Sequence, residues 1–108
     1  MEEKKDYRAE LFYEPKNGYD RLSSEEAGKL EGYCEGYKAY LNVARTEREA
    51  VNEAIALAER EGFVEYTPGM SLSAGDKVWF SNRGKALMLA VIGKKSAAEG
   101  LVIAAAHV

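Results

Sequence analysis

The sequence predicts an α/β fold in which two N-terminal helices are followed by a segment of a mixed β-sheet. Two observations support this class. Between residues 23 and 61, apolar residues recur at spacings of three and four, which is the period of an amphipathic helix. From Phe63 onward, the pattern changes to short alternating or fully apolar runs, which are typical of strands.

The first helix is expected to begin at Ser23, after an irregular N-terminal arm over residues 1–22. Ser23 and Glu26 have the spacing of a capping box, in which each side chain satisfies a backbone N–H group of the first turn. Within the arm, the apolar residues 11–13 are compatible with either a short strand or a packed segment.

A second capping box predicts that another helix follows almost immediately. The Thr46 hydroxyl is placed to accept from a first-turn N–H group, and Glu49 is placed to reach back to the cap. Gly62 is a typical stop signal, because glycine readily adopts the left-handed conformation that ends many helices.

Four strands are expected after the helices, over residues 63–66, 77–81, 86–92 and 101–106. The second and third should pair as an antiparallel hairpin across a turn at residues 82–84. The third and fourth are apolar at every position, which is typical of strands that are buried on both faces near the centre of a sheet.

The predicted sheet has more apolar surface than the chain can cover. Two helices can cover one face of the sheet, and no further element is available for the other face. We therefore expect residues 23–108 to be the opening part of a larger, incomplete α/β domain.

Composition excludes several classes of protein. The 15 Lys and Arg residues and 18 Asp and Glu residues give a net charge of −3, so neither nucleic acid nor an acidic membrane surface is an expected partner. The single cysteine, Cys34, excludes an intramolecular disulfide and favours a reducing compartment. The sequence shows neither a secretory signal nor an apolar run long enough to span a membrane, so a cytoplasmic location is expected.

His107 is the only histidine and the main candidate for chemistry. It follows an apolar run that is expected to form a strand, and sites in open α/β sheets lie at the carboxyl ends of strands. One imidazole does not make a zinc site, because zinc takes three or four protein ligands. A solvated histidine without a function remains the alternative.

Other candidates have simpler explanations beside the functional ones. Arg83 and Lys85 could bind an anion, but they also suit a solvated turn. The stripe of tyrosines at positions 33, 37 and 40 is more typical of a core than of a ligand site. Cys34 is expected to be a half-buried filler, and no serine lies in a nucleophile-elbow motif.

An ordered series of motifs resembles the N-terminal region of aspartyl-aminopeptidase-type (aminopeptidase I) zinc metallopeptidases. The series consists of residues 46–51 after a Tyr-rich helix, residues 75–86, residues 90–93 and residues 100–108. In that family, the last stretch continues as His-x-Asp-Ser-Pro-Arg. The resemblance covers almost the whole chain and is most secure over residues 33–108.

The resemblance implies a two-zinc exopeptidase that removes N-terminal, often acidic, residues from peptides. The resemblance also implies that the subunits of the complete enzyme assemble into a homo-oligomer, a dodecamer. His107 matches the histidine of the family's His-x-Asp motif and is thereby expected to ligate zinc. The orienting aspartate, the bridging carboxylate, the general base and the other ligands lie downstream in the family, so the 108-residue chain is expected to be inert by itself and to bind no zinc tightly.

A second hypothesis is a small, self-contained protein-interaction module without catalysis. Such a module would use the apolar sheet face or the tyrosine stripe to bind a partner. A coding sequence that continues past Val108 with Asp, Ser, Pro and Arg would favour the peptidase, whereas a stably expressed short form would favour the module.

Overall fold

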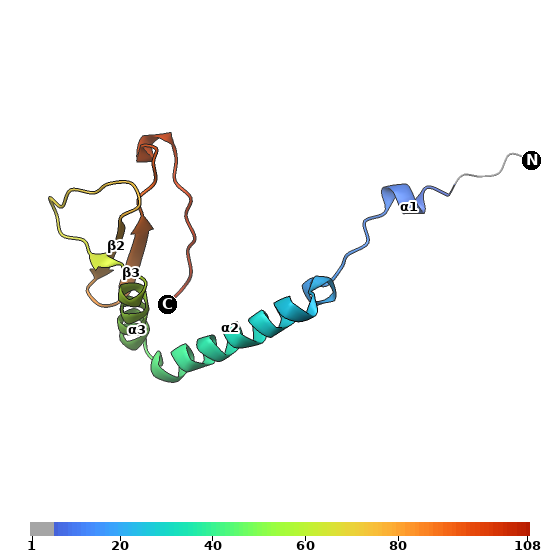
Figure 1. The fold of residues 1–108 in the computed structure, drawn as a ribbon, viewed down its shortest axis with the longest axis horizontal. Coiled ribbons are helices and arrows are strands. Elements are labelled where there is room, and N and C mark those ends of the chain that lie inside the picture. The colour runs from blue at the N-terminus through green and yellow to red at the C-terminus, as the bar shows by residue number, and fades with distance from the viewer. Residues whose placement is uncertain (1–5) are drawn as a thin grey trace, which may run out of the picture. The chain divides into compact units, whose positions relative to one another are not determined.

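A computed structural model describes residues 6–108 of the chain. Its regular elements, in chain order, begin with the four-residue helix α1. They are α1 (Arg8–Leu11), the 3₁₀ turn η1 (Gly18–Arg21), α2 (Ser24–Val43), α3 (Glu47–Arg60), β1 (Val64–Glu65), β2 (Lys77–Asn82), β3 (Ala86–Val91) and the 3₁₀ turn η2 (Ala97–Glu99). The order of two long helices followed by a mixed sheet confirms the predicted α/β class (Figure 1).

The chain divides into two compact units, Met1–Glu35 and Gly36–Val108. The first unit contains α1, η1 and the N-terminal part of α2. The second contains the rest of α2 and every element from α3 onward. The first five residues of the expected N-terminal arm lie outside the described residues.

The apolar residues of the arm neither form a strand nor pack into a core. Leu11 ends α1, and Phe12 and Tyr13 are 70% and 82% exposed. The two alternatives that the sequence suggested for these residues are therefore both wrong in this structure, because no neighbouring element covers them in the described part of the first unit.

The capping box at the start of α2 is present as predicted. The Ser23 backbone N–H donates to the Glu26 carboxylate at 2.8 Å, and the Glu26 backbone N–H donates to the Ser23 hydroxyl at 3.2 Å. The backbone hydrogen bond from Ser23, followed by the side-chain hydrogen bond, lowers the pKa of Glu26 below its ordinary value.

The cap of α3 differs slightly from the expected pattern. The Thr46 hydroxyl accepts from the Glu49 backbone N–H at 3.3 Å, as predicted. The Glu49 carboxylate, however, accepts from the Arg45 backbone N–H at 3.2 Å, one residue before the cap. Both hydrogen bonds still satisfy backbone N–H donors at the start of the helix.

Gly62 ends α3, as the sequence indicated. Its φ is +86°, and its N–H donates to the Glu59 carbonyl at 3.0 Å. The Phe63 N–H donates to the Ala58 carbonyl at 3.0 Å. This pair of hydrogen bonds is the Schellman arrangement, which requires a left-handed residue and turns the chain toward β1.

The three strands form one mixed sheet in the order β1-β2-β3. β1 is parallel to β2, with Val64 opposite Val78. β2 and β3 form the predicted antiparallel hairpin, with Trp79 opposite Leu89. The hairpin closes through a hydrogen bond from the Lys85 N–H to the Asn82 carbonyl at 3.1 Å.

Both residues between Asn82 and Lys85 have positive φ. Gly84 has a φ of +68°, as expected, but Arg83 also has a φ of +58°. Two successive positive φ values are the requirement of a type I′ turn, whose twist suits a hairpin. Arginine tolerates this conformation less well than glycine, so the turn places some strain on Arg83.

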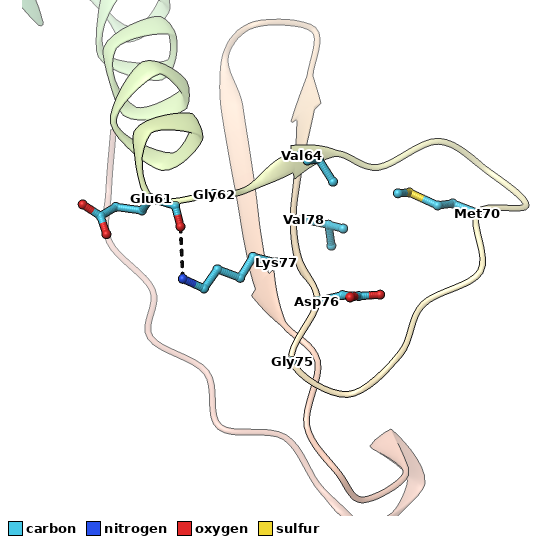
Figure 2. Close-up of a pocket in the computed structure, with 8 residues that line it drawn as sticks. All are labelled: Glu61, Gly62, Val64, Met70, Gly75, Asp76, Lys77 and Val78. Atoms are coloured by element: carbon cyan, nitrogen blue, oxygen red, sulfur yellow. Dashed lines mark hydrogen bonds between the residues drawn. The ribbon is translucent and has the colours of Figure 1, made fainter.

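The core lies in the second unit and is small. Among the described residues, four apolar side chains are buried: Val51 and Ala58 of α3, and Val78 and Trp79 of β2. Adjacent residues of a strand point to opposite faces, so β2 is covered on both faces. Helix α3 packs against β2 and β3, and the loop after β1 covers the side on which Val78 lies (Figures 1 and 2).

Two expectations about the apolar runs are wrong for this chain. Residues 101–106 form no strand, and the exposed fractions of Leu101, Val102 and Ile103 are 71%, 105% and 77%. β3, which was expected to be central, lies at the edge of the sheet, and β2 takes the central place. The reason is that an apolar run specifies burial only where a partner strand or a covering layer is present.

We expect acid to weaken the first turn of α2. Since the pKa of Glu26 is lower in the helix than in the unfolded chain, its ionised form stabilises the turn above its ordinary pKa. That contribution is lost as the pH falls through the lowered pKa. A carboxyl titration by NMR should show that Ser23→Ala raises the pKa of Glu26. The neighbouring Ser24→Ala substitution should leave it unchanged, and an equal effect of both would contradict the capping assignment.

We expect Val51→Ala to lower the free energy of unfolding by on the order of 2 kcal/mol, because Val51 is 1% exposed and its methyl groups would leave a cavity. Leu57→Ala removes more atoms from the same helix, but Leu57 is 42% exposed. It should therefore cost less than Val51→Ala. Urea unfolding followed by the fluorescence of Trp79, the single tryptophan, would rank the two variants.

Candidate functional site

His107 lies in the irregular C-terminal segment and is exposed. Its Nδ1 lies 3.3 Å from the carbonyl oxygen of Val108, which is its immediate neighbour. No element of the sheet positions the imidazole, because residues 100–108 form neither helix nor strand. The predicted strand that would have placed it at a sheet edge is absent.

The residues that the structure describes do not compose a metal site. In residues 6–108, no group of three or more His, Cys, Asp and Glu side chains converges in a way that could hold a metal ion. Zinc takes three or four protein ligands in most proteins. His107 alone does not fit that requirement, and no step of metal chemistry follows from the residues of this chain.

Besides Arg83 and Lys85, which the sequence indicated, a third cation lies at the hairpin turn. Arg48, at the start of α3, donates through Nη1 to the Arg83 carbonyl at 3.1 Å. This hydrogen bond joins residues that are 35 positions apart and fixes the turn against the helix. The Arg48 guanidinium therefore supports the strained turn, and it could attract an anion as well.

The tyrosine stripe of α2 does not form a ligand site within the second unit. The rings of Tyr37 and Tyr40 are stacked, with centroids 6.5 Å apart. The Tyr40 hydroxyl donates to the Ala50 carbonyl at 3.1 Å, so it links α2 to α3. Tyr37 is 55% exposed. These contacts are structural, and they do not enclose a cavity.

None of the candidate nucleophiles makes a contact within the described residues that would activate it. The Ser81 hydroxyl accepts from the Gly84 N–H at 3.1 Å and supports the hairpin turn. The Ser73 backbone N–H donates to the Asp76 carboxylate at 2.8 Å. Cys34 is a free, exposed thiol rather than the expected half-buried filler. Trp79 is buried as core, but its indole Nε1 has no hydrogen-bond partner in the described residues.

An open groove of about 390 Å³ lies beside β2, and residues from the end of α3, from β1 and from the loop before β2 line it. Figure 2 shows Val64, Val78 and Asp76 pointing toward the loop that carries Met70, whereas Lys77 points the other way. The Lys77 ammonium donates to the Glu61 carbonyl at 3.0 Å and lies 5.7 Å from the centre of the Phe63 ring.

The groove is lined by apolar side chains and by three charged residues, Glu61, Asp76 and Lys77, and this arrangement has limited chemistry. Asp76 already accepts from the Ser73 N–H, and Lys77 is held on the other side of the strand. No pair of groups in the groove has the geometry of a nucleophile and its base. The sequence offered one signal for this feature, the glycine-bracketed loop between residues 68 and 75, but the groove itself depends on the parallel pairing of β1 with β2.

None of the helices within residues 6–108 combines the length and the apolar character that crossing a membrane requires.

Comparison with known proteins supplies the context that the site geometry lacks. No protein-family model matches the chain. A probable M18 family aminopeptidase 1 of Clostridium acetobutylicum is 33% identical over 103 residues, which are 92% of this chain and 22% of that protein. A probable M18 family aminopeptidase 1 of Borrelia garinii is 31% identical over 91 residues, which are 84% of this chain and 20% of that protein.

The fold agrees with the sequence similarity. The crystal structure of aminopeptidase I from Borrelia burgdorferi B31 matches this structure with a TM-score of 0.72 and 30% sequence identity. The match covers 80% of this chain and 21% of that one. The chain thus spans about a fifth of the length of the relatives that it matches.

Sequence and fold therefore confirm the resemblance that the motifs predicted: the chain is related to the M18 aminopeptidase family, over about a fifth of the length of its matched members.

Proposed function

We propose that this chain is part of the catalytic domain of a zinc-dependent aminopeptidase that removes N-terminal, acidic residues from peptides. The observation that carries the proposal is the agreement of two independent comparisons. Relatives named as M18 family aminopeptidases match 92% of the chain, and the solved aminopeptidase I matches its fold with a TM-score of 0.72.

His107 is the residue that we assign to metal binding in the complete enzyme. Its support is its place at the end of the motif of residues 100–108, together with the exposure of its side chain. In this proposal, the remaining ligands and the orienting carboxylate come from parts of the enzyme that the chain does not cover. An orienting carboxylate would fix the tautomer of the imidazole, as it does for most metal-bound histidines.

The same proposal makes the 108-residue chain inert by itself. Peptide hydrolysis requires an activated water, a base and a group that polarises the carbonyl. Two carboxylate residues, Glu61 and Asp76, line the groove beside β2, and Asp76 already accepts from the Ser73 N–H. We infer that residues 23–108 are an incomplete α/β domain and that residues 1–22 are an arm attached to it.

The remaining parts of the proposal concern the complete enzyme. We infer a peptide substrate, two zinc ions, a cytoplasmic location and a homo-oligomer of dodecameric type. The peptide substrate is supported by the names of the relatives, which are aminopeptidases. The two zinc ions and the dodecameric assembly are supported by the motif resemblance, and the single cysteine, Cys34, favours the reducing compartment.

A protein-interaction module is the second candidate function, and one observation favours it. Several large apolar side chains of the second unit are strongly exposed, including Met88 at 69% and Ile103 at 77%. Contiguous exposed apolar surface is uncommon on soluble monomers and often marks an interface.

We expect the isolated chain to bind zinc only weakly. A single imidazole without further ligands does not hold zinc against water. Isothermal titration near neutral pH should give no one-to-one site tighter than about 1 μM, which corresponds to roughly −8 kcal/mol. A tighter site that disappears in His107→Ala would show that the chain carries a complete metal site.

We expect His107→Ala in the complete enzyme to reduce bound zinc and aminopeptidase activity together. Metal content would be measured by mass spectrometry, and activity would be measured with an N-terminal glutamyl or aspartyl peptide. Asn17→Ala, in the N-terminal arm, is a control that should change neither quantity. Full zinc occupancy and full activity after His107→Ala would remove His107 from the site.

A further inference from the structure

The sequence contains one Asn-Gly pair, Asn17 and Gly18, at the start of η1. Asn17 is exposed and is the N-cap of η1, because its side-chain oxygen accepts from the Tyr19 N–H at 3.1 Å. The amide carbon of an asparagine side chain can be attacked by the backbone nitrogen of the next residue, which closes a succinimide ring. The pair is therefore a place where the chain can react with itself, apart from the proposed function.

Gly18 presents its backbone nitrogen without steric hindrance. Glycine has no side chain that could block the approach of its nitrogen to the preceding residue. A Cβ added at Gly18 would meet no atom within 4 Å, so the surrounding space is open as well. Within residues 6–108, the Gly18 N–H donates to no other group, as is usual for the first residue of a helix.

The hydrogen bond from Tyr19 favours attack at the Asn17 side chain. It is donated to the oxygen on which negative charge develops when a nitrogen adds to the amide carbon. A backbone N–H group that points at such an oxygen stabilises the transition state. Ring closure also requires rotation about the Asn17 backbone, which is extended, with φ −64° and ψ 141°. No residue of η1 is buried, so this rotation displaces no packed side chain.

The other three asparagines of the sequence lack these features. Asn42 and Asn52 lie inside α2 and α3, where the next residue has a side chain and its N–H belongs to the hydrogen-bond ladder of the helix. Asn82 ends β2 and precedes Arg83, which also carries a side chain. Asn17 is thus the asparagine whose neighbour offers an unhindered nitrogen.

We propose that Asn17 is a site of spontaneous deamidation in this chain. The Gly18 nitrogen forms a bond to Cγ of Asn17, and the side-chain nitrogen leaves as ammonia with the proton that the Gly18 nitrogen loses. Water, the only other reactant, then opens the ring. Cleavage of the new bond gives aspartate, whereas cleavage of the original peptide bond gives isoaspartate, in which the main chain runs through Cγ. The inference does not depend on the proposed peptidase function.

The two products differ in their effect on η1. Both add one negative charge to a chain whose net charge is −3. Aspartate keeps an oxygen that can accept from the Tyr19 N–H, and it is as good an N-cap residue as asparagine. Isoaspartate adds a methylene group to the main chain and makes Cγ part of it, so the Tyr19 N–H loses its side-chain acceptor.

The test incubates the 108-residue chain at physiological pH and temperature in water that is enriched in heavy oxygen. Peptide mapping by mass spectrometry measures conversion at each asparagine, and enzymatic methylation detects isoaspartate. We expect conversion at Asn17 to be on the order of tenfold faster than at any other asparagine, which a small difference in activation free energy provides. Heavy oxygen should appear in both products, because water opens the ring.

Gly18→Ala is the decisive variant, because its Cβ meets no atom within 4 Å and the Asn17 cap is retained. It should slow conversion at Asn17 by about tenfold. Gly28→Ala makes the same substitution in α2, where a Cβ also meets no atom within 4 Å, and it should leave the rate unchanged.

Three results would overturn the proposal. The first is conversion at Asn17 that is no faster than conversion at Asn82. The second is an unchanged rate at Asn17 in the Gly18→Ala variant. The third is aspartate at position 17 without any isoaspartate, because a succinimide opens to both products.

Discussion

The packing of α3 against β2 and β3 is the interaction on which the second unit depends. Its buried residues come from two segments, Val51 and Ala58 from the helix and Val78 and Trp79 from the strand. Neither half is stable alone, because a short hairpin or an isolated helix of this length is only marginally stable in water. The Schellman turn at Gly62 and the hydrogen bond from Arg48 to the hairpin turn hold the two halves together from opposite ends.

This small core explains why the structure has a fold but no complete site. β2 is covered by α3 on one face and by a loop on the other, and the groove lies between β2 and that loop. β3 and the segment after it have a covering layer on one side at most. The single imidazole lies in that uncovered segment, and its neighbours within the described residues offer it no further ligand.

The open surfaces of the chain have different physical origins. Residues 101–103 are apolar and exposed, and their backbone groups bond to no other backbone group of residues 6–108, which is the pattern of a strand without its sheet. The β3 edge is different, because its residues are paired with β2 and exposed cations precede and follow the strand.

The sequence alone determined the elements whose signals are local. Capping boxes, the glycine stop of α3 and the hairpin turn depend on neighbouring residues, so Ser23, Thr46, Gly62 and Gly84 predicted their boundaries correctly. The motifs also predicted the similarity to M18 family aminopeptidases that the comparisons found. Only the tertiary structure decided which strand is central, that Arg48 supports a turn 35 residues away, and that the apolar run before His107 forms no strand. An apolar run states that a segment can be buried, but burial itself requires a partner, and the partner is a property of the assembled chain.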